Sequence, residues 1–269
     1  MSSILTNVGA MAALQSLSHT NKSSTMTQNR IGTGLRVENA KDNSSSWAIA
    51  TAMRGDVSGC NAISENLALS TSTVSVARNG AETVTGLLNQ IKEQVVQVNG
   101  TGADTAKTQD DVDRLIAQID GVVNAAEING RNYINSGTTV DILASMDRSG
   151  GTLAVQTITL NEADLTAAGL SVDTLDVTSA TALDDVEAAI ASAVSAAAEF
   201  GSVQKRLEIQ GDFVKALTDA LSEGVGSLVD ANMEEEAARL SALQVQQRLG
   251  IQSLSIANSA PQSILALFR

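Results

Sequence analysis

Small and apolar residues recur in alternating steps of three and four through the middle of the first half of the chain. The positions are Cys60, Ile63, Leu67, Ser70, Val74, Ala77, Ala81, Val84, Leu88, Ile91, Val95 and Val98. An unbroken heptad spacing is typical of a long helix packed along other helices. At 1.5 Å per residue this helix is about 58 Å long, too long for a compact globule to surround. The pattern predicts a rod whose packing seam includes Ile63, Leu67, Val74, Val84, Leu88, Ile91 and Val95.

Both ends of the chain are amphipathic and almost free of charge. Up to Asn21 the only ionisable side chain is His19, and nothing between Arg248 and Arg269 is charged. The apolar spacing positions are Ile4, Val8, Met11, Leu14 and Leu17 at one end and Leu240, Leu243, Ile251 and Leu254 at the other, with Gln247 as a polar member. A surface helix normally carries Lys and Glu on its outer face. We therefore expect two helices that meet inside an assembly.

Between these ends the pattern changes three times. Residues 31–43 predict a connector that contains Gly32 and Gly34, with Asp42 and Asn43 as candidate N-caps of a helix from Ser44 to Val98. Strand-like runs at 139–143 and 153–160 predict a β-hairpin. A long helix resumes near Leu183, with candidate interruptions at the glycines of 201, 211 and 224–226.

A second helix is expected after the turn at 99–102. Its predicted seam is Val112, Leu115, Ile119, Val122 and Ala126. The acidic residues at 110–113 could suggest a metal cluster, but acids in the first turns of a helix complement its dipole, and we favour that interpretation. The same holds for the acids at 184–187.

The predicted fold is mainly α: a long coiled-coil-like helical bundle with a small β-hairpin insert and paired N- and C-terminal helices. The expected parts are an N-terminal helix and connector (1–44), a helical rod (45–136), a hairpin or irregular segment (137–182), a returning rod helix (183–225) and a C-terminal helix (226–269). The ends of the chain return to one place. The residues between the two ends are expected to extend outward from that place.

Composition narrows the function. The net charge of −13 in 269 residues argues against a partner that is nucleic acid or an anionic membrane, because both require a basic patch. Aromatic residues make up only 2%, which suits thin seams between helices better than a globular core. No basic segment precedes an apolar run at the amino end and no stretch of about 20 apolar residues occurs, so neither a signal peptide nor a spanning helix is expected. Unless another export route carries it, the chain would be cytoplasmic.

Catalytic chemistry is not expected. With His19 as the single histidine, a histidine-based metal site or an H-E-x-x-H motif cannot form. There is no P-loop, and the glycines at 32 and 34 lack the rest of a dinucleotide fingerprint, so no cofactor is expected. Cys60 continues the seam and Trp47 is interpreted as a packing anchor.

Short motifs at both ends of the chain are similar to those of a known protein family. At the amino end Gln28, Arg30, Gly34, Arg36, Lys41 and Asp42 stand in runs similar to Gln-x-Arg-Leu-Ser-Thr-Gly-x-Arg and Ser-Ala-Lys-Asp. At the carboxyl end Asp230, Asn258, Leu265, Leu267 and Arg269 match in order. Together they resemble bacterial flagellin, the subunit of the flagellar filament. Ile31, Gly32 and the run 44–47 depart from the family pattern, and the match covers about the first 135 and the last 85 residues.

The resemblance implies a mechanism. The uncharged ends, with Leu265 and Leu267 among the packing residues, would fold as a helical pair lining an inner tube when subunits polymerise. Subunits would leave the cell unfolded through the flagellar export apparatus with an export chaperone, and add at the distal tip. Partners would include other flagellins, the hook–filament junction and the filament cap, outside the cell. The short β segment implies a minimal form without large outer domains and a thin, mostly smooth filament.

One helix departs from the family in a second way. Residues 88–97 resemble the helix that an innate immune receptor recognises in many flagellins, but Gln90 and Gln94 stand where Arg and Leu are usual. We expect weak recognition by that receptor. Two other functions stay open at this point: a hook–filament junction subunit, and a soluble coiled-coil adaptor.

Overall fold

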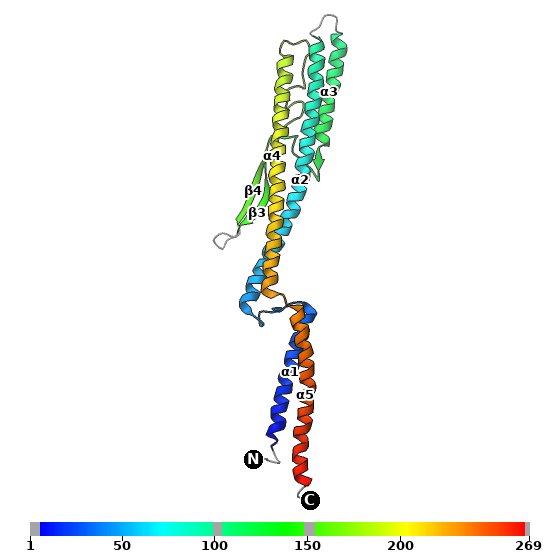
Figure 1. The fold of residues 1–269 in the computed structure, drawn as a ribbon. Helices are drawn as coiled ribbons and strands as arrows, with labels where there is room; N and C mark the ends of the chain where they lie inside the picture. The colour runs from blue at the N-terminus through cyan, green and yellow to red at the C-terminus, as the bar shows by residue number, and fades with distance from the viewer. Residues whose placement is uncertain (1–5, 99–103, 148–153, 267–269) are drawn as a thin grey trace. The chain divides into compact units, whose positions relative to one another are not determined.

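The computed structural model describes residues 6–98, 104–147 and 154–266, and it is mainly α-helical (Figure 1). The helices are α1 (Val8–Thr33), α2 (Ser44–Val98), α3 (Thr105–Ala125), α4 (Ala182–Val229) and α5 (Met233–Ala266). Two antiparallel strand pairs accompany them, β1 (Glu127–Ile128) with β2 (Arg131–Asn132), and β3 (Thr139–Asp147) with β4 (Ala154–Asn161). The predicted helical bundle with a small β insert is confirmed.

The chain forms two compact units. The terminal unit comprises Met1–Asp56 and Ala220–Arg269, and the central unit comprises Val57–Asp219. Both boundaries fall inside helices, in α2 and α4, whereas the sequence analysis divided the chain at residues 44 and 226. The roles assigned to those five sequence segments stay predictions.

In the central unit α2, α3 and α4 lie side by side (Figure 1). The seam predicted on α2 is buried at all seven named positions, each at most 2% exposed. On α3 the predicted seam is partly wrong. Ile116 and Val123 are buried, while Leu115 and Val122 are only half-buried. A heptad seam that starts at Val112 can continue three residues later, at Leu115, or four residues later, at Ile116. The sequence leaves both seams open, and tertiary packing selects the second.

Both ends of α2 match the prediction at Ser44 and Val98. Asn43 caps the helix, because its Oδ1 accepts a hydrogen bond from the Ser46 amide at 3.1 Å. Asp42 has a different role: its Oδ2 accepts from the amides of Glu38 and Asn39, which closes the connector. The connector begins later than expected, since α1 continues to Thr33 and ends on Gly34 in the left-handed region.

The sequence analysis missed one hairpin. Residues 127–132, assigned to the helical rod, form β1 and β2 around Asn129 and Gly130, both with positive φ (51° and 76°). Asn-Gly is the preferred pair for a two-residue type I′ turn, because both of its central residues need positive φ. This dipeptide is visible in the sequence and was a usable signal.

The predicted hairpin is longer than expected. β3 and β4 pair from Thr139↔Asn161 to Asp147↔Ala154, with an irregularity between Leu143 and Ser145. The residue between them, Ala144, is buried, and its carbonyl oxygen accepts a hydrogen bond from Gln210 Nε2 at 3.1 Å. A side chain of α4 thereby satisfies a group at the break in the ladder.

Helix α4 runs without interruption through all of its candidate glycine breaks. Within the described residues it is the one helix long and apolar enough to cross a membrane by length and composition, which the sequence analysis did not anticipate. Its apolar side chains Val186, Phe200 and Leu207 are at most 1% exposed. These side chains give α4 an apolar face that packs in the central unit.

Candidate subunit-packing surface

Helices α1 and α5 form an antiparallel pair in the terminal unit. At one end Asn7, the N-cap of α1, donates from Nδ2 to the carbonyl oxygen of Ala257 at 2.7 Å. At the other end Arg30 Nη1 lies 2.9 Å from Glu236 Oε1. These two contacts set the register of one helix against the other. The predicted pairing of the chain ends is thus present within a single chain.

The seam between the two helices is made mostly of small side chains. On α1 the residues facing α5 are Ala10, Ala13, Leu17, Thr20, Ser24 and Thr27, in heptad order and half-buried or buried. On α5 the corresponding heptad is Glu236, Leu240, Leu243, Gln247, Gly250, Leu254 and Ala257. Of these α1 residues the sequence analysis named only Leu17, because the large apolar residues of α1 lie on its other face. Alanine, serine and threonine at the same spacing were the available signal.

Gly250 allows the closest approach in this seam. A Cβ added there would lie 3.3 Å from Leu17 Cδ1. The sequence analysis named the neighbouring Ile251 as a subunit-packing residue. Ile251 is 55% exposed within the chain, so its contact with another copy stays a prediction. A side chain at position 250 would crowd Leu17, which favours glycine there.

Glu236 is the one charged residue buried in the described part of the chain, at 5% exposure. Burial alone would raise the pKa of Glu236, but hydrogen bonds from Arg30 and Thr27 and the charges of Arg30 and Arg239 lower it below its ordinary value. The carboxylate therefore stays ionised and joins the end of α1 to the start of α5. Because its partner side chain is 23% exposed, water shares in solvating the pair.

Signature residues gather where the connector meets the α4–α5 junction. Gly34 accepts a hydrogen bond at its carbonyl from the Ala231 amide, and Leu35 forms a bridge with Asp230. Arg36 donates from Nη2 to the carbonyl oxygen of Leu228 at 2.8 Å, which satisfies one of the last carbonyls of α4. The two chain segments that cross this junction are thereby tied together.

A small core lies beside the junction. Val37, Ala50, Val225 and Val229 are buried there, and the partly buried hydrophobic residues packed on them include Trp47. The interpretation of Trp47 as a packing anchor is confirmed.

Large apolar side chains on the same two helices face away from the pair. Val8, Met11 and Leu14 on α1 are 72%, 65% and 60% exposed. Exposed apolar residues of α5 are Val245, Leu249, Ile251 and Ile256. We call these residues the outer stripes. Each terminal helix thus has two faces, one packed within the chain and one that exposes apolar surface.

The remaining predicted residues are distributed as follows. Gln28, Lys41 and Asn258 are exposed, and Gln28 Nε2 is 3.4 Å from Ser24 Oγ. Leu265 lies in α5, but its side chain is outside the described part. Ile4, Leu267 and Arg269 lie outside the described residues.

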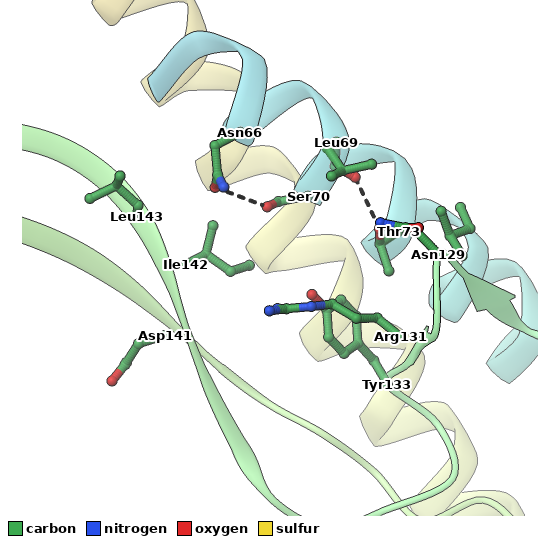
Figure 2. Close-up of a pocket in the computed structure, with 11 residues that line it drawn as sticks. Asn66, Leu69, Ser70, Thr73, Asn129, Arg131, Tyr133, Asp141, Ile142 and Leu143 are labelled. Atoms are coloured by element: carbon green, nitrogen blue, oxygen red, sulfur yellow. Dashed lines mark hydrogen bonds between the residues drawn. The ribbon is translucent and has the colours of Figure 1, made fainter. Parts of the chain in front are cut away.

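Figure 2 shows a pocket of about 310 Å³ in the central unit, between α2, the β1–β2 turn and β3. The Arg131 side chain points into it, whereas that of Asp141 points away and accepts a hydrogen bond from Thr159 Oγ1 at 2.8 Å. Its lining contains neither a histidine nor a pair of carboxylates. Among the described residues no group of three His, Cys, Asp or Glu side chains could hold a metal ion. The lining therefore offers no pair of groups for acid–base catalysis.

Comparison with known proteins decides the family. Residues 4–139 match the bacterial flagellin N-terminal helical region, and residues 183–268 match the bacterial flagellin C-terminal helical region. The chain belongs to the bacterial flagellin family.

Similar flagellins align along their whole length. A flagellin of Brucella melitensis biotype 1 is 42% identical, with 100% of both chains covered. Flagellin FljK of Caulobacter vibrioides is 38% identical over 100% of this chain and 99% of its own. The crystal structure of Bacillus cereus flagellin matches 55% of this chain and 88% of its own at 19% identity and a TM-score of 0.47.

Membership in this family establishes the broad function. This flagellin is a structural subunit of the bacterial flagellar filament, which lies outside the cell, and it self-assembles. It is a structural protein and not an enzyme. The alignment with the Brucella relative extends over 281 residues and covers all of both chains.

Proposed function

We propose that the outer stripes of α1 and α5 pack against neighbouring subunits in the interior of the filament. The observation that carries this proposal is the pair of faces on each terminal helix. The inward faces are already used within the chain, whereas Val8, Met11 and Leu14 have no apolar cover there. Contiguous exposed apolar residues on a helix with almost no charge favour burial by another protein surface.

Polymerisation then completes the folding of the terminal helices. Within one chain the α1 side of their seam consists mostly of small side chains that meet a few leucines of α5, and one buried ion pair joins the two helices. Small side chains bury little apolar area, so this pair gains little stability from packing. Contact between outer stripes on neighbouring copies would add the missing burial, so that folding and assembly are coupled.

The predicted segments take distinct places in this scheme. Residues 1–44 and 226–269 form the inner tube, residues 45–136 and 183–225 surround it, and the segment 137–182 lies on or near the outer face. The described part of that segment supports an exposed position, because Val155 in β4 is 55% exposed.

Export and addition at the tip follow the route that the family resemblance implies. The subunit leaves the cell unfolded, without a cleaved signal peptide, through the flagellar export apparatus with a chaperone. It then adds at the distal end, between the hook–filament junction and the filament cap. A chain whose ends gain stability only on assembly is suited to this route.

Seeded polymerisation tests the outer stripes. Full-length protein with Val8, Met11 and Leu14 replaced by Ser is mixed with filament fragments and followed by sedimentation and electron microscopy. We expect the variant to stay in the supernatant at concentrations where the unchanged protein elongates the fragments. The control is Val155→Ser, which removes a similarly exposed side chain from the hairpin and should elongate normally.

Two results would contradict the proposal. Normal elongation by the triple variant would show that the stripe on α1 is not buried between subunits. Discrete oligomers of the unchanged protein under every seeding condition would instead support a junction or adaptor function.

A further inference from the structure

We propose that the pocket around Arg131 receives an acidic side chain from a second copy of this chain. The inference rests on the proposed assembly into filaments and goes beyond it by naming a contact of the central unit. The pocket volume of about 310 Å³ is at the lower end for ligand sites, which fits a protruding side chain better than a cofactor.

Arg131 is the cation available in this pocket. Its side chain is exposed and points into the cavity (Figure 2), and within the described residues it makes no ion pair or hydrogen bond. Asp141 lines the same pocket but forms no ion pair with Arg131, since its carboxylate turns away and accepts a hydrogen bond from Thr159. A guanidinium presents a planar fork of donors that matches a carboxylate in two-point contact. Arg131 is therefore suited to recognise an acid from outside its own chain.

Charge is divided very unevenly between the two units. The terminal unit has eight basic and eight acidic residues, so the whole formal charge of −13 falls on the central unit, with nine basic and 22 acidic residues. An unpaired cation in a concave site is unusual in such a unit. Because every copy carries this excess of acidic residues, a carboxylate of a neighbouring copy is the complementary ligand.

One end of the central unit concentrates this acidity. Segments 104–114 and 173–187 hold nine acidic and two basic residues, and all nine acids are exposed. The segments lie together, because Gln109 donates to the carbonyl oxygen of Leu175 at 2.8 Å and accepts from the Val177 amide at 3.0 Å. We call these two segments the acidic pole.

The pole cannot reach the pocket of its own chain. Lys92 of α2 forms an ion pair of 2.7 Å with Glu187, so the acidic pole lies beside the part of α2 around Lys92. From Lys92 to Thr73 in the pocket wall, α2 rises about 28 Å at 1.5 Å per residue. A contact between pole and pocket must therefore join two copies. It uses two different surfaces of the subunit, and repeating such a contact generates an open helical polymer.

Zero-length cross-linking tests the contact directly. The conservative variant Arg131→Lys keeps the positive charge and places an amine in the pocket. Filaments and monomers of this variant are treated with a carbodiimide, and the linked peptides are identified by mass spectrometry. We expect a link between position 131 and an acid of the pole in filaments and none in monomers. Links from position 131 only to acids of its own neighbourhood, such as Asp141, in both samples would overturn the proposal.

Charge reversal gives an independent readout. We expect Arg131→Glu to raise the critical concentration for elongation about tenfold, against less than twofold for Lys215→Glu, an exposed cation of the same unit. Adding Asp110→Lys and Asp111→Lys to Arg131→Glu should recover most of the loss if the contact uses α3. If the contact uses α4 instead, adding Asp184→Lys and Asp185→Lys to Arg131→Glu should recover the loss. Equal effects of Arg131→Glu and Lys215→Glu would overturn the inference, while the absence of filaments from unchanged protein would contradict the proposed function instead.

Discussion

Replacing Glu236 with Gln should loosen the α1–α5 pair selectively. The Glu236 carboxylate is 2.9 Å from Arg30 and 3.7 Å from Arg239, and its side chain is 6% exposed. Breaking a fully buried ion pair costs about 3–5 kcal/mol. Arg30 is 23% exposed and the Gln amide can still accept its hydrogen bond, so we expect a smaller loss, about 2 kcal/mol in the free energy of opening.

Millisecond hydrogen exchange on the full-length monomer measures this loss. A change of about 2 kcal/mol corresponds to about a 30-fold lower protection of amides at the end of α1 and the start of α5. The matched control is Glu235→Gln. Glu235 is 65% exposed and contacts Arg239 at 3.3 Å, so its removal should cost less than about 0.5 kcal/mol. Equal protection in the two variants would refute the reasoning.

The pH dependence of the same experiment has a definite sign. Because the pKa of Glu236 is lowered in the folded chain, its contribution is complete above the unfolded value near 4.5 and is lost as the pH falls through the lowered pKa. The difference in protection between the unchanged protein and Glu236→Gln should therefore shrink in acid. A difference that stays constant down to pH 2 would show that the ion pair is not its source.

Four further outcomes can be measured. Gly250→Val should separate α1 from α5 by crowding Leu17 and lower protection of both helices, whereas Gly211→Ala, with open space at its Cβ, should stabilise α4 by about 0.5–1 kcal/mol. Gly130→Ala should lower the free energy of unfolding by about 1 kcal/mol, because alanine is strained at a φ of 76°. An unchanged melting temperature would contradict this prediction. Exposed Gln90 predicts weak activation of the innate immune receptor in a reporter-cell assay, and activation as strong as that of typical flagellins would show the prediction to be wrong.

The sequence predicted the long elements well because each carries many repeats of one period. α2 could be bounded at Ser44 and Val98 since its seam extends over several heptads and its cap is a single Asn. Where a helix offers two seams, the pattern alone is ambiguous. Choosing Leu115 over Ile116 depended on neighbours that only the folded chain supplies.

In the terminal helices, too, the sequence pattern alone did not identify which face packs within the chain. Large apolar residues such as Met11 were expected in the packing surface, but within one chain the seam uses Thr20, Ser24 and Thr27. Hydrophobicity indicates that a face is to be buried and does not say whether the cover comes from the same chain. Glu236 was missed because a buried carboxylate is recognisable only through its partners, and Arg30 is distant in sequence.

The uneven division of charge between the two units has a consequence for whole filaments. If the charged units are on the outside and the neutral ones inside, a filament behaves as a negatively charged colloidal rod. At 0.1 M salt the Debye length is about 10 Å, so neighbouring rods repel only when nearly touching, and added salt weakens even that barrier. Side-by-side bundling is therefore opposed by surface charge, while elongation depends chiefly on apolar contacts between the outer stripes of neighbouring copies. Surface charge thus limits clumping in width, and added salt should promote that clumping.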